Sequence, residues 1–178
     1  MRVDVSTGLC VGVKQVLSPH FDARPSGNVP DLVILHGISL PPGEYGGPWI
    51  ARLFTGGLPS DHHPFFATLA GLRVSAHLLL QRDGALVQFV SFNARAWHAG
   101  KSSWQGRDAC NDYSIGIECE GTDDEPYTDA QYDTLRRLLP VLLEAYPAIT
   151  RERIVGHSNV APGRKTDPGP SFDWSRVR

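Results

Sequence analysis

The sequence predicts a single α/β or α+β domain built around a central mixed β-sheet. Its 178 residues match the size of one domain, so residues 1–178 are treated as a unit. Apolar runs short enough for strands occur along the same chain as a segment whose leucines recur at helical spacing. An Asp83-Gly84 pair between two apolar runs indicates a hairpin, which adds an antiparallel pair to the sheet.

Five segments have the pattern of strands: residues 32–35, 74–80, 85–90, 114–120 and 154–157. The first is a continuous apolar run that ends at His36, as expected for a buried strand. The fourth alternates. We expect Ile115, Ile117 and Cys119 to face the core and Gly116, Glu118 and Glu120 to face the other side.

One long helix and two short ones are expected. Thr128 and Gln131 form a capping box, and apolar residues at helical spacing follow it. Pro140 lies within that pattern, which predicts that the helix is kinked or split there. Residues 48–54 and 64–69 each have a proline near the first turn of a short helix.

Composition excludes several classes of protein. With 17 Lys+Arg against 19 Asp+Glu, the net charge is −2, so we expect no nucleic-acid partner. No apolar run reaches the ~18 residues that a membrane-spanning helix needs. An acidic residue follows at Asp4 with no apolar stretch behind it, and three cysteines share no close spacing. We therefore expect a cytoplasmic protein without disulfides or a membrane partner.

Glycine and proline concentrate in residues 37–64 and 162–170. Long connections of this kind inside a compact domain are often functional. Residues 37–64 also contain Tyr45, Trp49 and Phe54, which need burial. We expect this segment to pack beside a cleft and to move when substrate enters.

Two histidines occupy similar places, because His36 and His157 each end a predicted strand and begin a loop. Asp167 follows ten residues after His157. Two histidines and one carboxylate would leave one zinc position open for water, as hydrolysis requires. The alternative is that both histidines are only half-buried structural residues, since no HExxH motif is present.

Four other residues each allow a structural and a functional interpretation. Glu118 and Glu120 are either a solvent-facing pair or include a general base near the metal, with Gly116 leaving room beside Glu118. Lys165 is either a surface lysine or the group that meets a developing oxyanion. Trp97 is either core or a platform for a sugar.

Three further residues are expected to be structural. His77 lies among apolar strand neighbours and is expected in the core. His62 and His63 precede Pro64 and are expected at a helix entry. Cys119 points with the apolar side of its strand and is expected to be an inert thiol.

Several motifs follow one another in order along the chain. They are Leu35-His36-Gly37-Ile38-Ser39-Leu40-Pro41-Pro42-Gly43-Glu44-Tyr45-Gly46-Gly47, Arg73-Val74-Ser75-Ala76-His77, Arg95-Ala96-Trp97-His98-Ala99-Gly100, Cys110-Asn111-Asp112, Ser114-Ile115-Gly116-Ile117-Glu118, Gly121-Thr122-Asp123, and Gly156-His157 followed by Arg164-Lys165-Thr166-Asp167-Pro168-Gly169-Pro170. Together they resemble the N-acetylmuramoyl-L-alanine amidases of the AmpD type, from about His20 to Trp174.

The resemblance implies a mixed sheet flanked by helices, with one Zn²⁺ in a surface cleft. It implies that the zinc ligands are His36, His157 and Asp167. It also implies Glu118 as catalytic acid and base, and Lys165 as the oxyanion stabiliser. The implied substrate contacts are Arg73, Trp97, Arg107 and Arg164. The implied reaction is hydrolysis of the amide between the lactyl group of 1,6-anhydro-N-acetylmuramic acid and L-alanine, in cytoplasmic cell-wall recycling.

Two positions depart from the family pattern. Gly37 stands where asparagine is common, and Ser158-Asn159 stands where Cys-Asp is common. We expect these changes to alter substrate contacts or the support of the zinc ligands. Two other functions stay open: a non-catalytic muropeptide-binding module, and a lytic amidase that acts on polymeric peptidoglycan. We expect a monomer with a small-molecule substrate, an anhydro-muropeptide.

Overall fold

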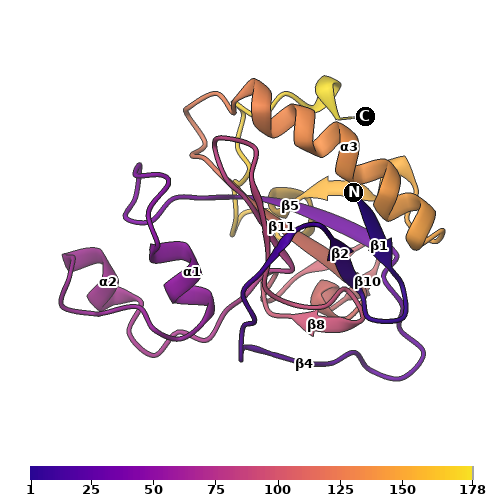
Figure 1. Ribbon diagram of the computed structural model, residues 1–178, viewed down its shortest axis with the longest axis horizontal. Helices are drawn as coiled ribbons and strands as arrows, with labels where there is room; N and C mark the ends of the chain where they lie inside the picture. Colours follow the sequence, from indigo (N-terminus) through magenta and orange to yellow (C-terminus); the bar gives the residue numbers. More distant parts are fainter. Residues whose placement is uncertain (178) are drawn as a thin grey trace.

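A six-stranded mixed sheet forms the centre of the molecule (Figure 1). The computed structural model describes residues 1–177. The strand order is β12-β5-β11-β6-β7-β3, with every neighbouring pair parallel except β6 and β7. The strands are β3 (Lys14–Gln15), β5 (Leu32–Ile38), β6 (Leu78–Leu80), β7 (Leu86–Gln88), β11 (Ser114–Glu120) and β12 (Ile154–Gly156). The predicted mixed sheet and its hairpin are confirmed.

Helix α3 (Asp129–Ala145) covers one face of this sheet, above it in Figure 1. Its buried leucines share a core cluster with the side chains of β5 and β11 that alternate toward it, including Leu35 and Ile117. The opposite face carries a smaller cluster, to which η1 (Cys110–Asp112) and α4 (His157–Val160) contribute. The sheet therefore lies between helical elements, as the predicted class requires.

The short helices α1 (Trp49–Phe54) and α2 (Pro64–Thr68) form a separate group, at the left of Figure 1. Their buried side chains Ile50, Phe54 and Phe66 share a second core cluster with Leu79 and Val87 of the hairpin. Both helices were predicted, and the His63 side chain accepts a hydrogen bond from the N–H of Phe65 at the start of α2. The entry role expected for this histidine is confirmed.

The long helix begins with the predicted capping box, in which Thr128 and Gln131 bond each other's backbone N–H groups. It continues through Pro140 as one element, so the prediction of a split is wrong. Pro140 lies on the exposed side of α3. The carbonyl group that loses its helical partner there can bond water instead.

The predicted strand at 74–80 is reduced to Leu78–Leu80, because pairing with β11 begins only at Leu78. Upstream, the N–H of Ser75 bonds the carbonyl group of Trp97 instead of a ladder partner. Strand β5 runs three residues beyond the predicted range of 32–35, to Ile38. His77 is fully buried and accepts a hydrogen bond from Gly116 N–H, so its expected core position is confirmed.

Several very short elements were not predicted, because two or three residues carry no periodic pattern. Three two-stranded sheets pair β1 (Arg2–Asp4) with β2 (Leu9–Val11), β4 (Phe21–Ala23) with β8 (Ala94–Ala96), and β9 (Ser103–Trp104) with β10 (Arg107–Asp108). The 3-10 turns η2 (Arg151–Arg153) and η3 (Trp174–Arg176) complete the fold. Within residues 1–177, no helix has both the length and the apolar character needed to cross a membrane.

Candidate metal centre and active site

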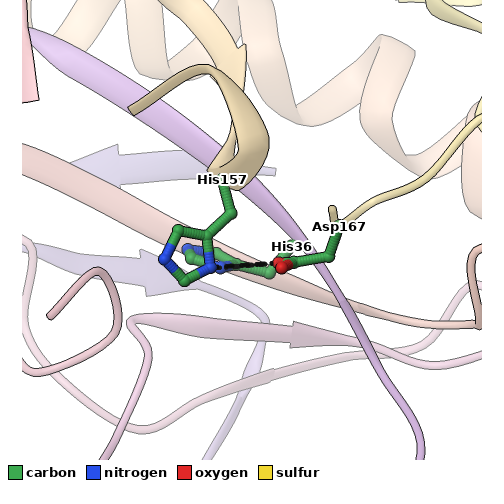
Figure 2. Close-up of side chains that lie close together, drawn as sticks. All are labelled: His36, His157 and Asp167. Atoms are coloured by element: carbon green, nitrogen blue, oxygen red, sulfur yellow. Dashed lines mark hydrogen bonds and ion pairs between the residues drawn. The ribbon is translucent and has the colours of Figure 1, made fainter. Parts of the chain in front are cut away.

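Three side chains converge at the ends of two neighbouring strands (Figure 2). His36 lies in the C-terminal half of β5, and His157 follows β12 directly as the first residue of α4. Because β12 pairs in parallel with β5, with Gly156 opposite Leu35, both histidines reach the same edge of the sheet. Asp167 enters from the loop after α4. The three distances are 3.0 Å between the histidine Nδ1 atoms, and 3.2 Å and 3.1 Å from Asp167 Oδ2 to His36 and His157.

This triangle fits a zinc ion. With bonds of about 2.0–2.1 Å, two corners of a zinc tetrahedron lie about 3.3 Å apart, close to the separations found here. Two imidazoles and one carboxylate are ordinary zinc donors and leave a fourth position for water or substrate. Both histidines are buried, at 1% and 3% exposure. Neither histidine is half-buried, and their Nδ1 atoms lie together with a carboxylate oxygen of Asp167.

The protonation of the cluster favours binding of a cation. Burial lowers the pKa of His36 to about 4, so its imidazole is neutral at pH 7. Burial alone would raise the pKa of Asp167, but hydrogen bonds with His157 and His36 hold it below its usual range. A neutral imidazole and an ionised carboxylate are the forms that donate to a metal.

Glu118 stands next to this cluster because of strand register. In the parallel pair of β11 and β5, Glu118 is directly opposite His36. Its Oε1 lies 3.9 Å from His36 Nδ1, while its buried Oε2 has no hydrogen-bond partner within residues 1–177. Burial and the charge of Asp167 raise the pKa of Glu118 well above its usual range. A buried carboxyl oxygen without a partner is costly, which indicates a group that this site is built to receive.

Glu120 faces the same side but has different neighbours. Its side chain accepts the backbone N–H groups of Gly46 (2.9 Å) and Arg82 (3.0 Å), and it is 1% exposed. Both carboxylates are buried, so the alternative of a solvent-facing pair is wrong. Glu120 holds the loop that contains Gly46 against the strand end.

Lys165 is exposed on the loop that also carries Asp167. Its positive charge partly offsets the rise that burial and Asp167 cause in the pKa of Glu118, so the ammonium group acts on the cluster electrostatically. The cluster therefore combines metal donors, a carboxyl group whose pKa is raised and a nearby cation. This set can catalyse hydrolysis of an amide.

The sequence profile of the N-acetylmuramoyl-L-alanine amidases matches residues 26–170. This chain belongs to that family. The 1,6-anhydro-N-acetylmuramyl-L-alanine amidase AmpD of Salmonella typhimurium (strain SL1344) is 58% identical over 171 residues, which span 96% of this chain and 91% of the relative. The resemblance drawn from the motifs is confirmed, and the protein is an amidase.

Solved structures of amidases share the fold. A selenomethionine derivative of AmpD has a TM-score of 0.96 at 57% identity, covering 100% of this chain and 98% of that one. AmiD from E. coli has a TM-score of 0.61 at 28% identity, covering 87% of this chain and 59% of that chain. AmiD was solved in complex with anhydro-N-acetylmuramic acid-L-Ala-D-gamma-Glu-L-Lys.

Two of the predicted substrate contacts of this amidase lie together. The Arg73 guanidinium lies over the Trp97 ring, 5.5 Å from its centroid, and Arg73 has no ion-pair partner within residues 1–177. Trp97 also stacks on His20, and its Nε1–H donates to Asp22. A half-buried ring beside a free guanidinium can receive an anionic ligand.

The other two predicted contacts are engaged elsewhere. Arg107 is ion-paired with Asp31 at 2.6 Å and lies over the Tyr113 ring. Arg164 donates to the carbonyl oxygens of Ala99 (2.6 Å) and Lys101 (2.7 Å). Each would have to give up these bonds to hold substrate, so their assignment stays a prediction from the resemblance.

Sequence reasoning missed residues that support the site from behind. The ring of His98 lies 2.9 Å from Nε2 of His36, and it occupies the space that Gly116 leaves open. The Tyr127 hydroxyl donates to the carbonyl oxygen of Pro168, next to Asp167. His98 and Tyr127 lie 62 and 91 residues from His36 along the chain, so no local pattern links them to it. The departure at Asn159 is conservative, because its side-chain oxygen accepts the N–H of Gly156, as an aspartate could.

Proposed function

We propose that this amidase is zinc-dependent and cleaves the amide between the lactyl group of 1,6-anhydro-N-acetylmuramic acid and L-alanine, in the recycling of cell-wall fragments. The observation that carries the proposal is the convergence of His36, His157 and Asp167 beside the unpartnered carboxyl oxygen of Glu118. The named reaction of the AmpD relatives, which match this chain over nearly its full length, supports the choice of substrate.

Zinc would be held by Nδ1 of His36, Nδ1 of His157 and Oδ2 of Asp167. Bound in such a site, zinc polarises carbonyl groups and makes water a nucleophile near pH 7. Two imidazole ligands and one carboxylate ligand would leave Zn²⁺ with one positive charge to offset. This residual charge favours an electron-rich carbonyl oxygen at the site.

Glu118 would move the proton. Its Oε2 takes a proton from the attacking water molecule and then returns it to the departing alanine nitrogen. An amine leaves far more readily than an amide anion, so this transfer is required for the bond to break. The raised pKa of Glu118 means that the carboxyl group holds such a proton more firmly than a surface glutamate would.

Lys165 would stabilise the negative charge that develops on the carbonyl oxygen, because its ammonium group lies within electrostatic reach of the cluster. Arg73 and Trp97 are proposed to contact the substrate. A muropeptide combines a sugar with an anionic peptide stem, and a tryptophan face beside a guanidinium suits both parts.

The protein is proposed to work as a cytoplasmic monomer. Cys10, Cys110 and Cys119 are all buried free thiols, as expected in a reducing compartment. Burial raises the pKa of Cys119 far above its usual range, which supports its expected inertness.

The test is turnover by the zinc-loaded full chain on three substrates: an anhydro-muropeptide, the matching non-anhydro muropeptide and whole sacculi. We expect release of the peptide from the anhydro-muropeptide at the highest kcat/KM. Binding of muropeptide without cleavage would identify a binding module. Faster release from sacculi than from the soluble fragment would identify a lytic amidase.

A further inference from the structure

Both histidines of the metal cluster turn their second ring nitrogen toward one short stretch of chain, residues 97–100. The Nε2 atom of His36 lies 2.9 Å from Nδ1 of His98. The Nε2 atom of His157 lies 3.2 Å from the carbonyl oxygen of Ala99. Two adjacent residues therefore contact both histidines on the side away from the cluster.

Without a metal ion, Asp167 Oδ2 can accept an N–H from Nδ1 of either histidine. A metal ion at the two Nδ1 atoms would require both lone pairs, so His157 would carry its proton on Nε2, where the carbonyl oxygen of Ala99 accepts it. For His36 to present Nδ1 in the same way, its Nε2–H must donate to Nδ1 of His98. His98 then carries its own proton on Nε2, which lies 3.3 Å from Ser114 Oγ and donates to it.

The His98 ring is held firmly in this place. A Cβ atom at Gly116 would lie 2.5 Å from Cγ and Nδ1 of the His98 ring, so only glycine leaves the space that the ring fills. The side-chain oxygen of Asn111 accepts the backbone N–H groups of both His98 (3.2 Å) and Ala99 (2.8 Å). One asparagine thus fixes the stretch that contacts both histidines.

We propose that His98 is a positioning residue of the amidase, which accepts the Nε2–H of His36 and so keeps its Nδ1 atom free and aimed at the metal. Partners of this kind behind a metal ligand are typically worth about 10–100-fold in metal affinity. The inference rests on the proposed zinc site, and it concerns the hydrogen bond behind His36, whose loss can be measured separately from catalysis.

Two substitutions separate a hydrogen-bonding role from simple packing. His98→Asn keeps an acceptor oxygen near the position of Nδ1, whereas His98→Leu has similar volume and no polar atom. If His98 only fills space, the apolar leucine should be tolerated better than asparagine. If it accepts from His36, the order is reversed.

The first measurement is the zinc dissociation constant of the full chain, from competition with a chelator. We expect His98→Leu to weaken zinc binding about 10–100-fold and His98→Asn to recover most of that loss. His62→Leu is the matched control, because this exposed histidine packs on Trp49 outside the cluster. Its zinc affinity should equal that of the wild type.

The second measurement is the nitrogen-15 spectrum of the His36 imidazole in the zinc-loaded protein. The wild type and His98→Asn should show a hydrogen-bonded Nε2–H that exchanges slowly with solvent, and His98→Leu should lose that protection. An equally protected Nε2–H in His98→Leu would overturn the proposal, as would zinc binding by that variant as tight as the wild type's. A wild-type protein that binds no zinc would refute the proposed function and this inference with it, whereas either of the two outcomes above in a zinc-binding protein would refute only the role of His98.

Discussion

Glu118 and Glu120 lie two residues apart on one face of β11, and their partners separate their roles. Glu118 has one oxygen near His36 and one with no partner within residues 1–177. Both oxygens of Glu120 accept backbone N–H groups. The first arrangement suits a group that exchanges a proton with substrate, and the second suits one that fixes a loop.

Substitution by glutamine should expose this difference. Glu118→Gln keeps the shape of the side chain and removes none of the three metal ligands. Zinc content and folding should therefore survive, while turnover falls about 10²–10⁴-fold. Glu120→Gln replaces an acceptor oxygen by an NH₂ group that faces a backbone N–H. It should cost about 1–3 kcal/mol of stability with a much smaller loss of turnover.

Turnover of the two zinc-loaded variants and their urea unfolding are the measurements. Near wild-type turnover in Glu118→Gln together with a large loss in Glu120→Gln would reverse the assignment of the two carboxylates.

Gly37 is closely fitted to Tyr127. A Cβ atom at position 37 would lie 2.5 Å from the Tyr127 hydroxyl, which bonds the carbonyl oxygen of Pro168 beside Asp167. Gly37→Ala should therefore destabilise the protein by about 1–3 kcal/mol.

A double-mutant cycle with Tyr127→Phe tests this reason directly. Removing the hydroxyl removes the clash, so Gly37→Ala should cost much less in the Tyr127→Phe background, as measured by urea unfolding. Equal costs in the two backgrounds would show that the hydroxyl is not what excludes a side chain at position 37.

At the scale of elements, the strands that carry the site were the easiest to predict. The apolar run before His36, the alternation of 114–120 and the short run before His157 gave β5, β11 and β12. Their register was not predictable, because it depends on pairing between strands about 80 and 120 residues apart in the chain. That register places Glu118 opposite His36. The strand patterns alone could not predict this pair, so the prediction of the site depended on the family motifs.

The supporting residues were not predictable for the same reason. His98 reaches His36 only because Gly116 leaves a gap on the neighbouring strand. Arg24, which precedes β5, donates from a half-buried position to the carbonyl oxygens of Phe92, Asn111, Asp112 and Ser114. Nothing in the sequence around Arg24 distinguishes it from a surface arginine.

The glycine- and proline-rich segment 37–64 was expected to move, and its structure divides it into two parts. Helix α1 packs into a core cluster, whereas residues 42–48 are largely exposed. Within that exposed stretch, Gly46 is tied to Glu120, and the Tyr45 hydroxyl donates to Glu125 at 2.7 Å. Mobility is therefore expected in residues 42–48 and not in α1.

Hydrogen exchange should follow this division. Amides in 42–48 should exchange much faster than those of β11, except the N–H groups of Gly43, Glu44 and Gly46, which are hydrogen-bonded. Glu120→Gln should speed the exchange of Gly46 without changing α1. Exchange in 42–48 as slow as in β11 would contradict the expected movement of this segment.

At the scale of the whole molecule, a metal in the cluster would join distant parts of the chain. His36 and His157 are 121 residues apart in sequence, and Asp167 belongs to the loop that follows α4. An ion bound only by the folded state stabilises it by mass action, by about 4 kcal/mol at a free concentration 1,000 times the dissociation constant.

Zinc should therefore raise the thermal unfolding midpoint of the metal-free protein in a concentration-dependent way. The same addition should leave the midpoint of Asp167→Ala nearly unchanged, since this variant lacks one of the three donors. An equal rise in both proteins would place the zinc elsewhere.

We propose that amide cleavage depends on zinc held by His36, His157 and Asp167. The most direct test measures zinc content and anhydro-muropeptide turnover on the same samples of the wild type, His36→Ala, His157→Ala and Asp167→Ala. The wild type should carry one equivalent of zinc and hydrolyse the substrate, and each variant should lose both properties. One equivalent of zinc retained in all three variants, or full turnover by the metal-free wild type, would contradict the account.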